Sequence, residues 1–324
     1  MVEASVAAAE RPTQQRSCPV VIKTREGELS FRPLWPTFGA VVDGVDLSQP
    51  VPADVARALY EAFLLYHGLL FTAQDLTAAQ ELSALRCFDE LPDAGASYGT
   101  QFRLAEAPLI RVLSNKVDDD GQRLGIVMGK QGPEWHTDGT SMARYPIASQ
   151  LYCLESNSVG GDTLFANAHL AFETMSPATR ARFSPLNATY NRDHLQRKLA
   201  VYDSRPLELT GAPDVSWPLV MAHSATGRSA FFFAGGEMTK IDGLSEDERL
   251  AVMAEISEHL FSSPHLLYRH AWEPGDLLVW DNRSVLHSAT FYDYAGCSRL
   301  LHHAVGAGLS PAHLVGVSTT PSAP

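Results

Sequence analysis

The sequence predicts a mainly β fold with flanking helices, built around a double-stranded β-helix, or jelly-roll, core. Outside two helical segments, most of the sequence consists of short strand-like pieces that Pro, Gly and Asp separate. Few segments have helical periodicity. Because strands and helices do not alternate regularly, two facing sheets are favoured over a parallel sheet with crossover helices.

Two segments have the pattern of amphipathic helices. Residues 52–68 carry a stripe of four apolar residues and reach Gly68, the expected stop of the helix. The stripe consists of Val55, Leu59, Ala62 and Tyr66. Residues 245–261 open with Ser245 and Glu248 at the spacing of a capping box. The apolar face expected for this second helix consists of Leu250, Met253, Ile256 and Leu260.

Six short runs are expected to form strands, because they are apolar and end at turn-forming residues. They cover residues 19–24, 109–115, 148–155, 229–235, 276–282 and 299–308. Trp135, Trp280 and residues 231–233 are expected in the core, and Asp118 to Asp120 at the tip of a solvated hairpin.

The chain is expected to form one jelly-roll domain over residues 18–308 of its 324 residues. The polar ends, residues 1–17 and 309–324, are expected to be disordered tails. Two long polar stretches, near residues 89–108 and 184–217, are poor strand candidates. Long loops in a compact domain are often functional, so these stretches are expected to be lids over a binding site.

Composition excludes several classes of partner. The formal net charge is −12 and no block of Lys or Arg occurs, which argues against nucleic acid and anionic membrane surfaces. No apolar stretch approaches the length of a membrane span. The four cysteines form no CxxC pair and are expected to be free thiols. A cytoplasmic protein that acts on a small molecule is expected, and a homo-oligomer is compatible with the sequence.

His136 and Asp138 stand two apart in the segment PEWHTDGT, residues 133–140. Residues i and i+2 of a strand point to one face, so the imidazole and the carboxylate can address a single point. Two histidines and one carboxylate form the facial set that binds iron(II) and leaves coordination positions open. The pair therefore predicts two ligands of a metal site, although a solvated turn with a hydrogen-bonded histidine fits the same residues.

The third ligand must come from a distant part of the chain. His287 follows an apolar strand and a turn containing Asp281 and Asn282, and such a histidine can reach the mouth of a barrel. His223 is a competing candidate. Position in the sequence does not choose between them.

The motifs WHTD, GGDTLF and WDNRSVLH, followed by an arginine, resemble the taurine dioxygenase/TfdA-like family of Fe(II)- and 2-oxoglutarate-dependent dioxygenases. The resemblance runs from about Phe38 to Gly308. It implies a jelly-roll dioxygenase that oxidises an unactivated C–H bond of a small metabolite with O₂ and releases succinate and CO₂. Hydroxylation is the expected outcome, and desaturation or cyclisation are alternatives.

The resemblance also implies site residues. His136, Asp138 and His287 match the iron ligands of the family. Thr163, which lies 27 residues after His136, and Arg299, which lies 12 residues after His287, match the residues that bind 2-oxoglutarate.

One departure from the family concerns the substrate. Members that act on sulfonates or aryloxy acids carry a second arginine four residues after the 2-oxoglutarate arginine, and here that position is His303. A histidine is a weaker, pH-dependent anchor for an anion, so taurine is disfavoured as the substrate. Further substrate-contact candidates are Gly139, Tyr98, Arg192 and Lys198, the last two in a cationic segment at residues 190–206.

Three alternatives remain at this point. A sulfonate or aryloxyalkanoate dioxygenase of the same family is one of them. A zinc-dependent hydrolase could use the same three ligands, but it would not need Thr163 and Arg299. A non-catalytic jelly-roll binding protein would have no use for the complete ligand set.

Overall fold

Two sheets face each other across an apolar interior, which confirms the predicted fold class. The computed structural model describes residues 20–24, 27–93, 102–127, 134–156, 160–203, 209–292 and 296–309. The order of strands in the large sheet is β1 (Val20–Lys23), β2 (Glu28–Trp35), β3 (Phe38–Asp43), β4 (Gly68–Phe71), β14 (Leu277–Asp281), β6 (Ala148–Ser156), β16 (Arg299–Val305) and β5 (Arg111–Ser114). The facing sheet is β13 (Leu267–His270), β7 (Thr163–Asn167) and β15 (Val285–Ala289).

The space between these sheets holds the core that supports the site. It is filled by buried side chains from both sheets, among them Phe165, Trp280, Val285 and Leu301. Trp280 is fully buried, as the sequence predicts, and so are Phe231 to Phe233. Such dense packing fixes the strands that carry the polar site residues.

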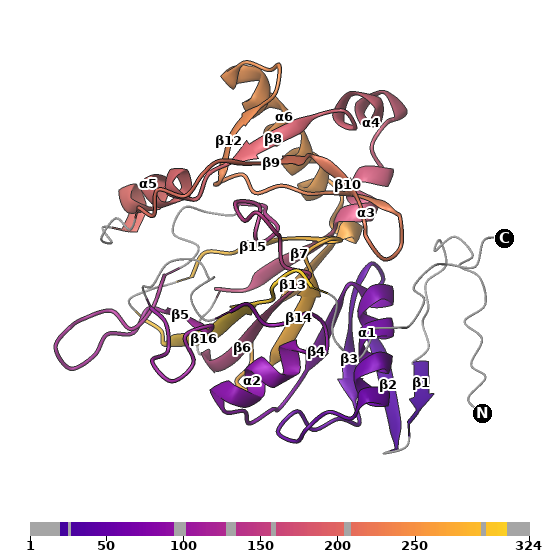
Figure 1. Ribbon diagram of the computed structural model, residues 1–324, viewed down its shortest axis with the longest axis vertical. Coiled ribbons are helices and arrows are strands. Elements are labelled where there is room, and N and C mark those ends of the chain that lie inside the picture. The colour runs from indigo at the N-terminus through magenta and orange to yellow at the C-terminus, as the bar shows by residue number, and fades with distance from the viewer. Residues whose placement is uncertain are drawn as a thin grey trace.

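Two helices cover the outer face of the large sheet, α1 (Ala53–Tyr66) and α2 (Ala78–Leu85) (Figure 1). The predicted apolar stripe of α1 is buried. The expected stop at Gly68 was wrong, because α1 ends at Tyr66 and His67 takes the left-handed conformation, with φ 67°. Gly68 instead begins β4, where Phe38 leaves no room for a Cβ atom.

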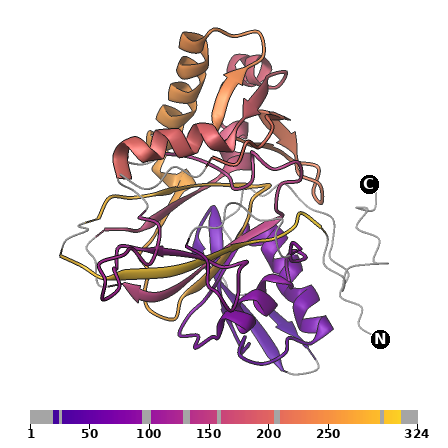
Figure 2. The same ribbon diagram turned by 60° about the vertical axis from the view of Figure 1, so that its left-hand side comes forward.

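The remaining elements form an upper part beside the two sheets (Figures 1 and 2). It contains α3 (Ala168–Glu173), α4 (Pro177–Phe183), β8 (Asn187–Tyr190), α5 (Arg192–Asp203), β9 (Val215–Pro218), β10 (Val220–Ala222), β11 (Ser229–Phe231), β12 (Met238–Ile241), α6 (Glu246–Phe261) and the 3₁₀ helix η1 (Pro264–Leu266). The stretch 184–217 was wrongly expected to lack strands, because β8 and β9 pair within it. In Figure 2, α5 lies across the boundary between the upper part and the sheets.

The predicted capping box of α6 is present, with Ser245 and Glu248 each bonding the other's backbone N–H. The predicted apolar face was wrong at one position, because Leu250 is 49% exposed. Arg249 is buried instead, and its guanidinium bonds Glu246 and the carbonyl of Met238. The buried residues of α6 are therefore Arg249, Val252, Ile256 and Leu260.

The predicted tails lie outside the described residues except for Leu309, whose backbone N–H donates to the buried Asp89. Within the described segments, Cys87, Cys153 and Cys297 are free thiols. No helix among the described residues combines the length and apolar character needed to cross a bilayer. Asp118 to Asp120 are exposed and lie at a tight turn, as predicted.

Candidate metal centre and its surroundings

Backbone pairing brings His136 and His287 together. The N–H of His136 donates to the carbonyl of His287 at 3.0 Å, and the N–H of His287 donates back at 2.8 Å. Residues paired in this way lie on one face, and the two ring centroids are 4.0 Å apart. Asp138 follows in the turn after His136, so the sequence spacing and one long-range pairing together assemble the cluster.

The donor atoms of this cluster converge on one point. Asp138 Oδ1 lies 3.9 Å from His136 Nε2 and 3.8 Å from His287 Nε2. All three ligand atoms lie within 4.8 Å of one another. Because bonds from a metal ion to such ligands are about 2.0–2.2 Å long, one ion can bridge each of these two pairs. The residues therefore fit a metal ion of the facial-triad type.

The protonation states suit a metal ligand set. The carbonyl of Glu134 lies 3.0 Å from His136 Nδ1 and so favours the proton on that nitrogen, which leaves the Nε2 lone pair for a metal. Burial, and then the neighbouring His136, hold the pKa of His287 well below its ordinary value. Burial opposes ionisation of Asp138, but the nearby His287, His303 and His136 outweigh it and keep the pKa of Asp138 below its usual range. The site thus presents neutral imidazole beside an ionised carboxylate.

The residue between the two nearby ligands fixes the segment in place. Thr137 is buried, its hydroxyl donates to the carbonyl of Asn282 at 2.7 Å, and its N–H donates to the carbonyl of Phe233 at 2.8 Å. Asn282 in turn donates to Ser149 at 2.9 Å. Sequence reasoning missed Thr137, and only its place inside the motif could have drawn attention to it.

The competing histidine lies elsewhere. His223 is buried with its Nε2 3.0 Å from Asp281 Oδ2, and Arg283 bonds the same carboxylate. This network lies at the turn before β15 and supports the strand that carries His287. The structure therefore brings His287, not His223, to the cluster.

Thr163 and Arg299 lie at one end of the strands that carry the cluster. Thr163 begins β7, two residues before Phe165, which pairs with His287 in β15. Arg299 begins β16, is 3% exposed, and donates from Nη2 to the carbonyl of Gly161 at 3.0 Å. Its buried Nε has no hydrogen-bond partner among the described residues. Burial lowers the pKa of Arg299, and a buried cation of this kind calls for an anion.

The hydroxyl of Thr163 accepts a hydrogen bond from the indole of Trp272 at 3.0 Å, and both residues are buried. Gly161 makes the approach of Arg299 possible, because a Cβ there would lie 3.1 Å from the guanidinium Nε. The motif GGDT thus places the carbonyl of Gly161 next to a buried arginine, and the hydroxyl of Thr163 follows two residues later. Sequence reasoning missed Trp272.

His303 points to the metal cluster from the same strand as Arg299. Its Nε2 lies 3.4 Å from Asp138 Oδ2, and its ring stacks on Trp280 at 6.2 Å. Trp280 also packs against His287, with centroids 4.9 Å apart. The tryptophan that the sequence places in the core therefore forms one wall of the site.

The other predicted contact residues are in varied positions. Gly139 follows Asp138 with φ +84°, a conformation that favours glycine at this turn. Lys198 lies 2.6 Å from Glu134, so its charge is matched by a carboxylate of the protein. Arg192 is buried at the start of α5. Tyr98 lies outside the described residues.

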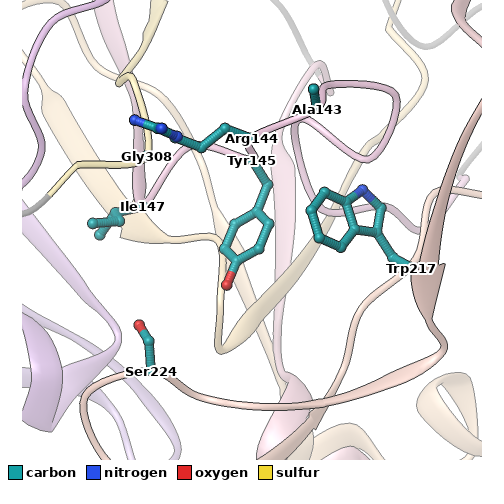
Figure 3. A pocket seen from close by; sticks show the side chains of 7 residues that line it. All are labelled: Ala143, Arg144, Tyr145, Ile147, Trp217, Ser224 and Gly308. Carbon is teal, nitrogen blue, oxygen red and sulfur yellow. The ribbon is translucent and has the colours of Figure 1, made fainter. Parts of the chain in front are cut away.

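A cavity of about 310 Å³ lies beside the segment that follows the metal cluster. It is lined by Ala143, Arg144, Tyr145, Ile147, Trp217, Ser224 and Gly308 (Figure 3). The rings of Tyr145 and Trp217 meet edge to face at 5.3 Å. None of the predicted site residues lines this cavity, so it does not mark the metal cluster.

Comparison with known proteins gives the family. The sequence profile described as "Taurine catabolism dioxygenase TauD, TfdA family" matches residues 30–305. The chain is 30% identical to an alpha-ketoglutarate-dependent 2,4-dichlorophenoxyacetate dioxygenase of Cupriavidus pinatubonensis, over 81% of this chain and 92% of that protein. It is 31% identical to an (S)-phenoxypropionate/alpha-ketoglutarate-dioxygenase of Sphingobium herbicidovorans, over 85% and 94% of the two chains.

Solved structures agree on the fold. A taurine dioxygenase from Burkholderia xenovorans superposes with a TM-score of 0.67 at 24% identity, covering 86% of this chain and 90% of that one. The structure of AAD-2 in complex with Mn(II) and N-oxalylglycine gives a TM-score of 0.70 at 24% identity, covering 87% and 98%. The family match and the 30% and 31% identical relatives set aside the zinc hydrolase and the non-catalytic binding protein. The chain belongs to the TauD/TfdA family, and it is a dioxygenase that uses Fe(II), 2-oxoglutarate and O₂.

Proposed function

We propose that His136, Asp138 and His287 hold the iron(II) of this dioxygenase. The observation that carries the proposal is the convergence of three donor atoms within 4.8 Å on paired backbone segments. Two imidazoles and one carboxylate match the donor set that iron(II) oxygenases use. The low pKa of the Asp138 carboxyl keeps it ionised, as a ligand must be.

Thr163 and Arg299 bind the 2-oxoglutarate in this proposal. Arg299 is a buried cation at the end of β16, and the distal carboxylate of 2-oxoglutarate supplies the anion that such a site calls for. Thr163 offers a hydroxyl close by along β7. The dicarboxylate would span from this end of the strands to the metal cluster.

Bound iron(II) would supply the oxidising power with 2-oxoglutarate and O₂ as cosubstrates, and the reaction would release succinate and CO₂. The chain itself orients the reactants and excludes water from them. Phe165 and Trp280 pack against His287, which fixes its imidazole and dries one side of the site. Thr137 and Asn282 hold the segment of the other two ligands.

The substrate in this proposal is a small organic molecule that is hydroxylated at an unactivated C–H bond. The 30% and 31% identical relatives named above favour an aryloxyalkanoate or a similar carboxylic acid. His303 in place of the second arginine argues against a sulfonate such as taurine, and a carboxylate substrate would need an anchor other than that arginine. The enzyme would work in the cytoplasm as one domain, with lids near residues 89–108 and 184–217.

Succinate release tests the proposal. The purified enzyme with Fe(II), 2-oxoglutarate and O₂ should form succinate faster when a substrate from a panel of small carboxylic acids is added. His136→Ala, Asp138→Ala and His287→Ala should each lose bound iron and at least about a hundredfold of this rate. His265→Ala, at an exposed histidine, is the matched control and should behave like the wild type. Full iron content and turnover in His287→Ala would move the third ligand to another residue.

A further inference from the structure

Three basic side chains form a row beside the metal cluster. Arg111 of β5 stands directly opposite His303 of β16, and an isolated bridge pairs Arg103 with Arg111. Directly opposed residues of antiparallel segments share a face, and neighbouring strands lie about 5 Å apart. The three side chains therefore start side by side on one face of the sheet.

That face is the interior of the jelly roll. The next pair along the same two strands is Leu113 and Leu301, and both belong to the buried cluster between the sheets. Side chains two residues apart on a strand lie on the same face. Arg111 therefore faces the interior with Leu113, and His303 does so with Leu301. The Nε atom of Arg111 is shielded from solvent.

The row reaches the metal cluster through His303. Its Nε2 is 3.4 Å from Asp138 Oδ2, and Arg111 stands beside His303 on the next strand, one strand further from the cluster. In a chain with a net charge of −12, a guanidinium whose Nε is shielded from solvent makes this place locally positive. A substrate with one negative group can bind there and keep its other end near the metal.

We propose that Arg111 binds the carboxylate of the substrate and so restricts the enzyme to small monocarboxylic acids. The proposal rests on the proposed iron site and names the substrate class of that site. A guanidinium grips a planar carboxylate through two parallel hydrogen bonds, which neither an imidazole nor an ammonium reproduces.

Other cations near the site are less closely placed beside His303. Lys198 pairs with Glu134, and Arg103 lies beyond Arg111 and donates to the carbonyl of Pro108 at 2.6 Å. Arg299 lies four residues from His303 on β16, about 13 Å along the strand. Arg111 is the arginine whose strand position places it beside His303.

Binding to an inactive complex tests the proposal. Enzyme loaded with Mn(II) and N-oxalylglycine, a redox-inert ion and an unreactive analogue of 2-oxoglutarate, is titrated calorimetrically with phenoxyacetate. Methyl phenoxyacetate serves as the neutral comparison ligand, and phenoxymethanesulfonate serves as the sulfonate comparison ligand. Wild type should bind the carboxylate at least about tenfold more tightly than either. Arg111→Met should lower the affinity for phenoxyacetate roughly ten- to a hundredfold and leave the affinity for the ester unchanged. Arg111→Lys, which keeps the charge without the fork, should lie between them.

The control is Arg57→Met, which removes an exposed arginine of α1 and should bind like the wild type. The Arg111 variants should still bind Mn(II) and N-oxalylglycine. If they do, a change in phenoxyacetate affinity concerns Arg111 and not the proposed metal and cosubstrate site. Equal carboxylate affinity in Arg111→Met and wild type would overturn the assignment. Three results for the wild-type enzyme would overturn it as well. These are equal affinity for the ester and the acid, tighter binding of the sulfonate, and no binding of any of the three compounds.

Discussion

The direction of one hydroxyl depends on a tryptophan far away in the sequence. Indole N–H is a donor only, so Thr163 must accept from Trp272 across the 3.0 Å contact. The hydroxyl's own proton is then left to donate to another group. In the proposed cosubstrate site the anion needs a donor at this place, so Trp272 would be a positioning residue for 2-oxoglutarate.

Trp272→Phe should weaken 2-oxoglutarate binding roughly two- to tenfold, because one neutral hydrogen bond that orients Thr163 is lost. The dissociation constant is measured by anaerobic titration, together with the KM for 2-oxoglutarate. kcat at saturating 2-oxoglutarate should change little. Trp35→Phe removes an indole hydrogen bond on the half-exposed surface and is the matched control. Equal 2-oxoglutarate affinity in Trp272→Phe and the wild-type enzyme would show that Trp272 does not orient Thr163 for the cosubstrate.

Arg299→Lys should raise the 2-oxoglutarate dissociation constant by about ten- to a hundredfold while iron stays bound. The loss of a charge-assisted forked contact is worth about 1.5–3 kcal/mol. Iron content is measured by a colorimetric chelator assay in the same samples. An unchanged dissociation constant would show that another cation holds the cosubstrate.

The residue types of the site were readable from the sequence, but their partners were not. The spacing of His136 and Asp138 predicts two converging ligands because local backbone geometry sets it. The choice of His287 over His223 depends on backbone pairing across about 150 residues of chain, which no local pattern encodes. The contact of Trp272 with Thr163 depends in the same way on how distant parts of the chain meet.

At the scale of elements, two carboxylates hold the metal-ligand segment on its two sides. Before the ligands, Glu134 pairs with Lys198 of α5 at 2.6 Å. After them, Glu237 accepts from the hydroxyl of Thr140 at 2.7 Å and from the N–H of Ser141 at 3.1 Å. The Glu134–Lys198 pair therefore connects α5 to the segment that carries His136 and Asp138.

A double-mutant cycle of Glu134→Gln and Lys198→Met should give a coupling of about 0.5–1 kcal/mol in the free energy of unfolding. The two side chains are 25% and 38% exposed, so solvent screening keeps the value modest. Arg197→Met, at an exposed neighbour on α5, should show no coupling with Glu134→Gln. Additive effects of Glu134→Gln and Lys198→Met would mean that the pair does not tie α5 to the segment.

Elements were predictable where local signals agree with packing. The cap of α6 and the buried stripe of α1 follow from short-range periodicity and side-chain capping. Gly68 was expected to end α1 because glycine often takes the left-handed conformation there. In the structure His67 takes that conformation, and Gly68 makes room for Phe38. Leu250 was wrongly placed on the buried face, because Arg249 is buried beside it and bonds Glu246 and the carbonyl of Met238.

For the whole molecule, a buried histidine predicts how stability depends on pH. His169 is 1% exposed, and burial lowers its pKa to about 4, although the carbonyl of Ser229 close to its Nδ1 opposes the shift. In the unfolded chain its pKa is about 6.5. The unfolded state therefore binds the proton first, and stability is lost as pH falls from about 6.5 toward about 4.

This residue should contribute a loss of about 1.4 kcal/mol per pH unit below its unfolded pKa. Urea unfolding between pH 7 and pH 5 measures the slope of the free energy of unfolding. His169→Gln keeps a donor for Ser229 and should have the shallower slope. His265→Gln, at an exposed histidine, should keep the wild-type slope. Identical slopes in His169→Gln and wild type would mean that His169 is not buried in its neutral form.

Anaerobic addition of Fe(II) and 2-oxoglutarate shows whether His136, Asp138 and His287 form an iron site that takes up 2-oxoglutarate. Iron(II) that binds 2-oxoglutarate through its 2-oxo-acid end gives a weak visible charge-transfer band, and zinc in the same site gives none. The wild-type enzyme should develop the band at one equivalent of iron and one of 2-oxoglutarate. His136→Ala, Asp138→Ala and His287→Ala should not develop it, and Arg299→Lys should need roughly ten to a hundred times more 2-oxoglutarate. A wild-type protein that binds iron without developing the band, or a band that survives loss of any one of the three ligands, would contradict the account.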